Sequence, residues 1–153
     1  MTDTAPRKAH ITASVLVDTS VERLWEATTD WKRQGDWVLF TRVRGTLHGG
    51  QRVGGGVEAW TGVGPLGFLD TMVITAWEPP HRCAVRHTGR VVRGTGLFEV
   101  TEAADGRSRL TWSEDLELPF GAAGGLGWRL LRPAVRAALA RSLSRLAASF
   151  AEA

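Results

Sequence analysis

Residues 107–150 read RSRLTWSEDLELPFGAAGGLGWRLLRPAVRAALARSLSRLAASF and contain two patterns that decide the fold. Up to Leu118, apolar and polar residues alternate, which predicts a half-buried strand. After Pro119 and a glycine-rich stretch, apolar residues recur every three or four positions, which predicts a helix from about Gly127 to Ala151. A long amphipathic helix that follows a strand indicates a sheet whose apolar face this helix covers. The expected apolar stripe consists of Leu131, Val135, Ala138, Leu139, Ser142, Leu146 and Phe150.

The rest of the chain predicts strands and two short helices. Alternation over His10–Asp18 indicates a first strand, and a capping-box pattern headed by Thr19 starts a helix that ends near Asp30. A further helical turn is expected over Trp31–Trp37. From about Leu39 to Leu118, strand-length segments alternate with turns, and none of the connections is long enough for a parallel crossover. We therefore expect an α+β fold with about seven antiparallel strands in a curved sheet.

Composition limits the class of protein. The 153 residues, 43% hydrophobic and 23% charged, suit a single domain over residues 1–153, with residues 1–9 as a loose tail. A net charge of +3 from scattered arginines argues against a nucleic-acid partner. Cys83 is the only cysteine, which favours a reducing, cytoplasmic location. Because no run of about 18 apolar residues occurs, we expect no membrane insertion.

Several short motifs then occur in a particular order. Val21-Glu22-Arg23-Leu24-Trp25 follows the first strand, and Asp30-Trp31 follows the first helix. Trp77-Glu78-Pro79-Pro80-His81-Arg82 marks a turn between strands, and Gly94-x-Gly96-x-Phe98 and Thr111-Trp112 lie in the last strands. From about Ile11 to Phe150 the chain thereby resembles the START-like, or SRPBCC, helix-grip superfamily of polyketide cyclase/dehydrase and lipid-transport-like proteins. The resemblance implies a sheet wrapped around the C-terminal helix, often with a cavity between them.

The period-two facing of strands selects candidate ligand-binding residues. If Arg82 and Arg86 face water, His87 faces inward, and the next strands place Phe98, Trp112 and Glu114 on the same inner surface. Three ionisable side chains on an apolar surface usually have partners or a task. Gly94 and Gly96 are expected to leave space beside them. The candidate ligand-binding residues are Asp70, Met72, His87, Phe98, Trp112 and Glu114.

Each ionisable candidate also has a purely structural alternative. Asp70 could cap a turn or pair with an arginine, and His87 could bond to backbone beside the following turn. A one-residue error of register would place Glu114 in water. The segment over residues 54–60 leaves two rows in competition for the inner face. For the segment over residues 68–76, the expected inner row is Phe68, Asp70, Met72, Ile74 and Ala76.

A metal site, a cofactor and a membrane-bound helix are not expected. His81, Cys83 and His87 would share one strand face, but Cys83 and His87 would lie about 13 Å apart, too far for one ion. No phosphate-binding loop is present, because Gly54-Gly55-Gly56 lacks the following lysine and helix. The arginine-flanked C-terminal helix could lie on an anionic membrane, but the sheet needs its stripe for the core.

Three functions follow from these observations. We expect binding or carriage of a hydrophobic or aromatic small molecule in an internal cavity. The first alternative is an enzyme of the aromatase/cyclase type, in which Glu114, His87 and Asp70 would share proton transfers. The second is a protein-interaction module that acts on a chaperone or a ribosome. The sequence favours the first function because it contains no paired catalytic motif of known spacing, and it leaves the oligomeric state open.

Overall fold

The computed structural model describes residues 7–152, in which one antiparallel sheet is combined with one long helix and two short ones. Short single-turn helices also occur at Leu47–Gly50 and Ala104–Gly106. The expected order of elements is confirmed. The main elements are β1 (Arg7–Val17), α1 (Val21–Thr29), α2 (Trp31–Gln34), β2 (Thr41–Gly45), β3 (Gly56–Val63), β4 (Leu66–Glu78), β5 (Arg82–Thr88), β6 (Arg93–Glu102), β7 (Ser108–Leu118) and α3 (Gly121–Ala151).

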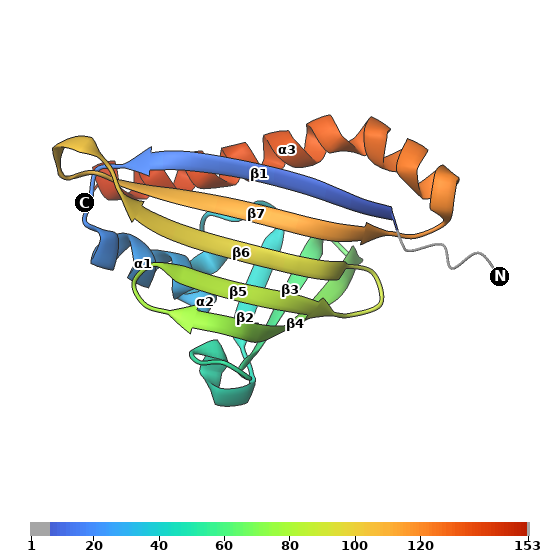
Figure 1. Cartoon of the computed structure of the whole chain (residues 1–153), viewed down its shortest axis with the longest axis horizontal. Helices are drawn as coiled ribbons and strands as arrows, with labels where there is room; N and C mark the ends of the chain where they lie inside the picture. The colour runs from blue at the N-terminus through green and yellow to red at the C-terminus, as the bar shows by residue number, and fades with distance from the viewer. Residues whose placement is uncertain (1–6, 153) are drawn as a thin grey trace.

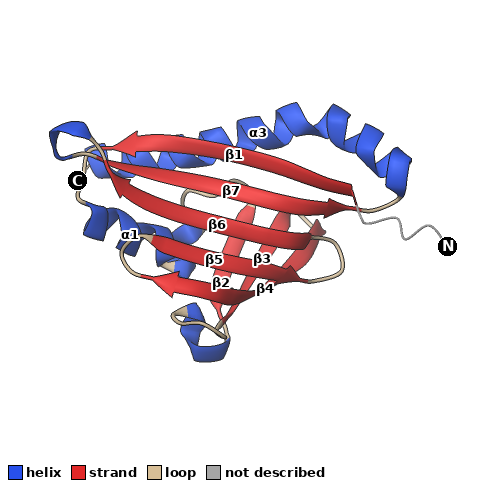
Figure 2. Ribbon diagram, viewed as in Figure 1, coloured by secondary structure: helices blue, strands red, loops and turns tan. Residues whose placement is uncertain are grey.

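The sheet has seven strands in the order β1-β7-β6-β5-β4-β3-β2, and every neighbouring pair is antiparallel. Figure 1 shows β2 and β3 running at a steep angle to β6 and β7, so the sheet is strongly curved. The long helix α3 extends along the β1 end of the sheet, and α1 and α2 lie near its C-terminal end (Figure 2). This arrangement is the expected α+β helix-grip fold.

The beginning of the chain differs from the expectation in two details. The strand β1 begins at Arg7, so residues 7–9 pair with β7 and do not belong to a tail. Residues 1–6 lie outside the described part of the chain. The N-cap of α1 is Ser20, whose hydroxyl accepts from the backbone of Arg23, and the expected cap Thr19 lies one residue too early. Both residue types favour N-cap positions, and Ser20 takes this one because the helix begins at Val21.

A bulge in β4 corrects the expected inner row. The register with β5 shifts between Ile74 and Ala76, so Trp77 lies opposite the buried Cys83 and Ala76 turns to the outer face. The indole of Trp77 then packs edge-on against Trp25 of α1, with ring centroids 5.1 Å apart. The bulge places a large aromatic ring in the core where strict alternation would have placed a methyl group.

The facing of β3, which the sequence leaves open, is decided by its neighbours. Val57 and Ala59 are buried on the inner face, where they pair with Met72 and Asp70 of β4. Glu58 faces outward and forms an ion pair with an arginine of β2. The inner face of the sheet is therefore apolar at β3.

The helix α3 is longer than expected and covers the sheet with only its second half. It begins at Gly121, and its buried side chains are Leu139, Ser142, Leu143 and Leu146. Leu131, expected in the buried stripe, is 61% exposed, and Val135 and Phe150 are only half-buried. The core thus ends about midway along the helix. None of the helices in residues 7–152 combines the length and apolar character that crossing a bilayer requires.

Candidate functional site

Three ionisable side chains from three strands meet on the inner face of the sheet. His87 Nδ1, at the end of β5, lies 2.9 Å and 3.0 Å from the two carboxylate oxygens of Asp70 in β4. On the other side of the ring, His87 Nε2 lies 2.9 Å from Glu114 Oε2 in β7. The three side chains are only 5%, 12% and 15% exposed, in the order His87, Asp70 and Glu114. We call Asp70, His87 and Glu114 the polar cluster.

The polar cluster fixes the charge of the histidine. Ionised carboxylates only accept hydrogen bonds, so each ring nitrogen of His87 donates, and a ring that donates twice is an imidazolium. Burial alone would lower the pKa of His87, but the hydrogen bonds and negative charges of Asp70 and Glu114 outweigh it and raise the pKa to about 10. The cluster is therefore one cation between two anions at neutral pH.

Glu114 also binds the neighbouring aromatic side chain on its own strand. The indole Nε1 of Trp112 donates to Glu114 Oε1 over 2.8 Å, while His87 donates to the other oxygen. Residues two apart on a strand share a face, so Trp112 and Glu114 are positioned together by β7. Each oxygen of the carboxylate accepts from one donor and retains a lone pair for a second.

The glycines of β6 do not leave the empty space that the sequence suggests. A Cβ on Gly96 would lie 2.9 Å and 3.0 Å from the carboxylate oxygens of Glu114, so this carboxylate occupies the space above the glycine. Gly94 has a φ of +120° and lies directly against the backbone of Asp115. The lack of a side chain at Gly96 therefore lets the carboxylate of Glu114 lie against the sheet. The lack of one at Gly94 allows its positive φ and its close contact with the backbone of Asp115.

An aromatic wall adjoins the polar cluster. The rings of Phe98 and Trp112 lie 5.3 Å apart, and Trp37 packs against them at 6.3 Å and 6.2 Å. Phe98, Trp112 and Met72 face inward as predicted and are half-buried. Sequence reasoning missed Trp37, because it lies in the connection between α2 and β2, where no periodicity signals its direction.

The remaining histidine and the cysteine of this region have structural roles. Burial raises the pKa of the Cys83 thiol to about 12, while the charge of Arg82 lowers it slightly, so the thiol stays protonated. His81 Nδ1 donates to the carbonyl of Val100 over 3.0 Å. Within residues 7–152, no group of three or more His, Cys, Asp or Glu has the geometry of a metal site.

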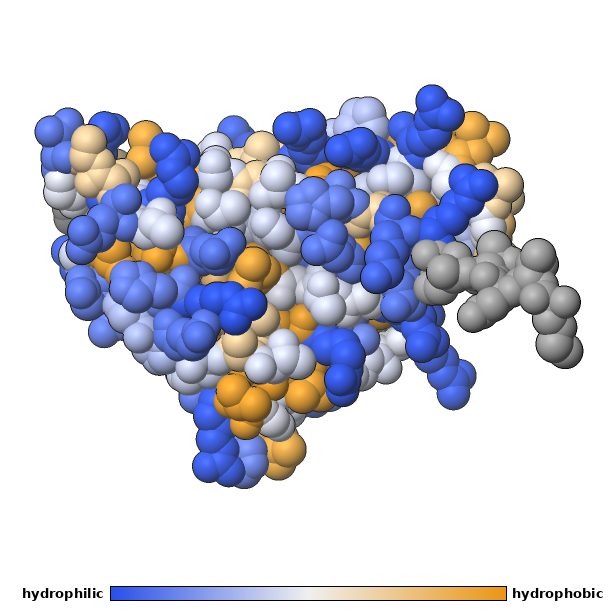
Figure 3. All heavy atoms as spheres, in the orientation of Figure 1, coloured by the Kyte–Doolittle hydropathy of each residue, from blue (hydrophilic) through white to orange (hydrophobic). Residues whose placement is uncertain are grey.

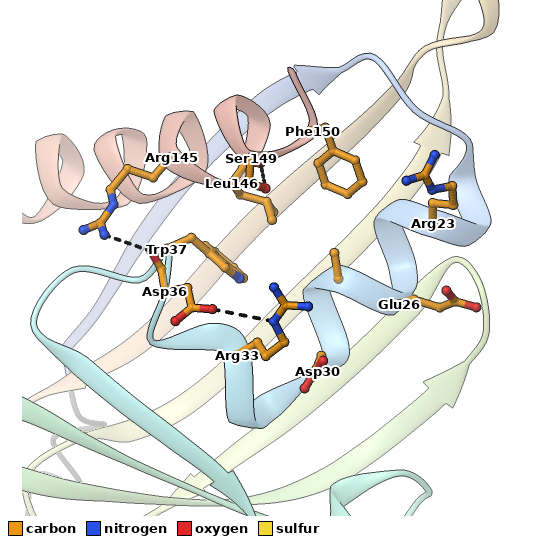
Figure 4. A pocket seen from close by; sticks show the side chains of 11 residues that line it. Arg23, Glu26, Asp30, Arg33, Asp36, Trp37, Arg145, Leu146, Ser149 and Phe150 are labelled. Atoms are coloured by element: carbon orange, nitrogen blue, oxygen red, sulfur yellow. Dashed lines mark hydrogen bonds and ion pairs between the residues drawn. The ribbon is translucent and has the colours of Figure 1, made fainter. Parts of the chain in front are cut away.

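A separate cavity of about 410 Å³ lies between α1, α2 and the C-terminal half of α3 (Figure 4). Its walls carry Arg33 and Asp36, 3.6 Å apart, and Arg145, which donates to the carbonyl of Asp36. Trp37 forms part of this wall, and its buried indole N–H has no hydrogen-bond partner among the described residues. Charged and apolar side chains both line this cavity, and none of the three residues of the polar cluster lines it.

Solved structures confirm the fold. The aromatase/cyclase ZhuI from a Streptomyces species superposes with a TM-score of 0.76 at 16% identity, covering 94% of each chain. A protein from Thermus thermophilus superposes with a TM-score of 0.75 at 13% identity, covering 94% of this chain and 98% of that one. For a protein from Mycobacterium smegmatis the TM-score is 0.68 at 20% identity, with 94% and 91% covered. Identities this low establish a common fold and no common activity.

Sequence comparison identifies the family. No curated protein matches the chain significantly. Residues 8–151, nearly the whole chain, match the family described as polyketide cyclase/dehydrase and lipid transport. This range includes all of the polar cluster and the aromatic wall. The chain therefore belongs to the polyketide cyclase/dehydrase and lipid-transport family, within the SRPBCC helix-grip superfamily.

Proposed function

We propose that the protein binds and carries a hydrophobic or aromatic small molecule on the inner face of its sheet. The observation that carries the proposal is the polar cluster, which lies beside Trp112 and Phe98 on an otherwise apolar surface. An apolar ligand would contact the aromatic wall, and its polar end would meet Glu114. The family description, which includes lipid transport, supports this class of ligand.

The charge of the polar cluster limits which polar group of a ligand could bind beside Glu114. One imidazolium between two carboxylates leaves one net negative charge in a largely buried place. A hydroxyl or an amino group could donate to the free lone pairs of Glu114, whereas a carboxylate would be repelled. We therefore propose a ligand with a neutral or cationic donor group, such as a phenol, an alcohol or an amine.

Binding is favoured over catalysis by the state of His87. A general acid or base works best when its pKa lies near the working pH. A histidine with a pKa of about 10, held by carboxylates on both ring nitrogens, neither releases nor accepts a proton readily at neutral pH. The protein-interaction alternative gives the polar cluster no role. Both alternatives are therefore less well supported than binding.

Tryptophan fluorescence tests the proposal. Apolar aromatic compounds and fatty alcohols are titrated into the protein, and we expect saturable quenching that weakens about tenfold or more in Trp112→Ala, as for loss of an aromatic contact and a hydrogen-bond donor. Trp60→Ala is the matched control, because Trp60 faces outward under Arg42, 5.4 Å from its ring centroid. Absence of saturable binding by any apolar compound would contradict the proposal.

A second titration tests the polar end of the ligand. 2-Naphthol and 2-naphthoate share one ring system and differ in the polar group, so calorimetry with both isolates that group. We expect 2-naphthol to bind more tightly, and Glu114→Gln to reduce the difference, because the neutral amide no longer repels the carboxylate. Tighter binding of 2-naphthoate by the wild-type protein would contradict the assigned charge.

A further inference from the structure

The first half of α3 exposes large apolar side chains to solvent. Phe120, which precedes the helix, is 85% exposed, and Leu126, Leu130 and Leu131 are 62%, 77% and 61% exposed. Leu130 precedes the buried Leu139 by nine residues, which at ~100° per residue turns it about 180° away from the sheet. Leu126 and Leu130 thus form a second apolar face that points away from the sheet, whereas Leu131 continues the core stripe beyond the part of the helix that the sheet covers.

The same half of the helix is uniformly basic. Between Gly121 and Ala151 the helix contains five arginines and no acidic residue. Three of them, Arg129, Arg132 and Arg136, are exposed in its first half. Within residues 7–152, none of these three takes part in an ion pair. Figure 3 shows apolar and strongly polar side chains mixed over this end of the molecule, at the upper right.

A cleft continues this surface onto the first strand. It has a volume of about 540 Å³ and lies between the beginning of α3 and the beginning of β1. Three cationic side chains line it, together with apolar groups and no acidic residue. The lining residues are Arg7, Lys8, Leu118, Ala122, Gly125, Leu126, Trp128 and Arg129.

We propose that the first half of α3 and this cleft form a docking surface for a membrane rich in anionic phospholipid. Leucine, tryptophan and phenylalanine beside arginine and lysine are the side chains with which a helix lies in the interface of a bilayer. The arginines reach the phosphates while the leucines enter the acyl boundary. The sequence argues against a membrane-bound helix because the sheet needs the apolar stripe for its core. That objection does not hold for the first half of α3, which the sheet leaves uncovered.

The charge of the surface argues against a second copy of the chain as its occupant. A two-fold contact through this face would place the arginines of one helix opposite those of the other, which is repulsive. A bilayer of anionic lipids supplies the opposite charge along the first half of the helix and also an apolar layer for the leucines. A single partner thus satisfies both properties of the surface.

The docking surface also lies near the polar cluster. Leu118, which lines the cleft, follows Glu114 by four residues on the same row of β7, a separation of about 13 Å. A molecule that leaves the inner face at this end would reach the bilayer directly. Docking itself does not depend on the proposed ligand, so the two proposals can fail separately.

Vesicle sedimentation tests the docking surface. The protein is mixed with vesicles of phosphatidylcholine alone, or with vesicles of equal parts phosphatidylcholine and phosphatidylglycerol, and the bound fraction is measured. We expect binding to the anionic vesicles that weakens with added salt, and little binding to the neutral ones. The variant Arg129→Gln/Arg132→Gln should bind the anionic vesicles roughly 30-fold more weakly, about fivefold for each arginine.

Two further variants and a stability measurement complete the test. Arg86→Gln/Arg109→Gln removes the same charge from exposed positions of other elements and should bind like the wild type. Leu126→Ser/Leu130→Ser should also weaken binding, while all variants keep their thermal midpoints because the side chains are exposed. Equal binding to both kinds of vesicle, no binding to either, or an equal loss in the control would overturn the proposal. Binding to polyglutamate but not to vesicles would overturn it in favour of an acidic protein.

Discussion

Replacement of His87 by alanine should destabilise the protein strongly and in a pH-dependent way. The substitution removes the imidazolium that lies 2.9 Å from both Asp70 and Glu114 and leaves two buried carboxylates without their cation. Breaking a buried ion pair by removal of one partner costs about 3–5 kcal/mol. The rise of the His87 pKa from 6.5 to about 10 corresponds to roughly 5 kcal/mol, which agrees with that range.

The pH dependence follows from the sign of this rise. Because the pKa of His87 is higher in the folded protein than in the unfolded chain, its contribution to stability is complete below about pH 6.5 and is lost as the pH rises toward 10. The difference in free energy of unfolding between wild type and His87→Ala should therefore be largest near pH 6. Between pH 6.5 and 10 it should shrink by up to about 1.4 kcal/mol per pH unit.

Urea unfolding of both proteins across this pH range measures the difference. Cys83→Ala serves as the control, because Cys83 is buried on the same row of β5. Its pKa of about 12 keeps the thiol uncharged in the folded protein over this pH range. The cost of this substitution should be nearly constant from pH 6 to about pH 8.5, because below the ordinary thiol pKa of 9.0 the group is protonated in the folded and the unfolded state alike. A His87→Ala penalty below about 1 kcal/mol, or one as constant with pH as that of the control, would refute the charge assignment of the polar cluster.

Three further experiments test separate parts of the structure. Leu139→Ala should cost about 2–5 kcal/mol in urea unfolding, whereas Leu131→Ala should cost below about 1 kcal/mol, because only the former is buried; equal costs would contradict the half-covered helix. Gly96→Ala should lower stability by about 1–3 kcal/mol because its Cβ meets the carboxylate of Glu114, and an unchanged unfolding midpoint would place that carboxylate elsewhere. Iodoacetamide should leave Cys83 unmodified in the folded protein at pH 8, as judged by mass spectrometry, since the thiol is buried and protonated; rapid alkylation would contradict its burial.

Much of the candidate site can be predicted from the sequence, because facing along one strand is a local property. Arginines on the outer row of β5 are enough to turn His87 inward, and Trp112 and Leu116 do the same for Glu114. That the two side chains touch depends on the registers of β5 with β6 and of β6 with β7, which set Gly96 opposite Glu114. Register between distant strands is non-local, so the sequence predicts a shared surface but not the hydrogen bonds.

The errors in the sequence prediction have the same origin. Strict alternation places Ala76 inside, but the bulge after Ile74 exchanges it for Trp77. The apolar pattern of α3 includes Leu131, but Leu131 is exposed in the structure. The sequence pattern does not show where the sheet stops covering the helix. A periodic pattern shows which face of an element is apolar, and the length of its partner decides how much of that face is buried.

The most direct test of the proposed function is nitrogen NMR of the ¹⁵N-labelled His87 ring during a ligand titration. At pH 8 we expect both ring nitrogens of His87 to carry protons, because its pKa is about 10. Saturating 2-naphthol should shift these signals in proportion to the bound fraction, as its hydroxyl joins the hydrogen bonds of Glu114. Saturable binding that leaves the His87 signals unmoved, or a ring that has lost one proton at pH 8, would contradict the account.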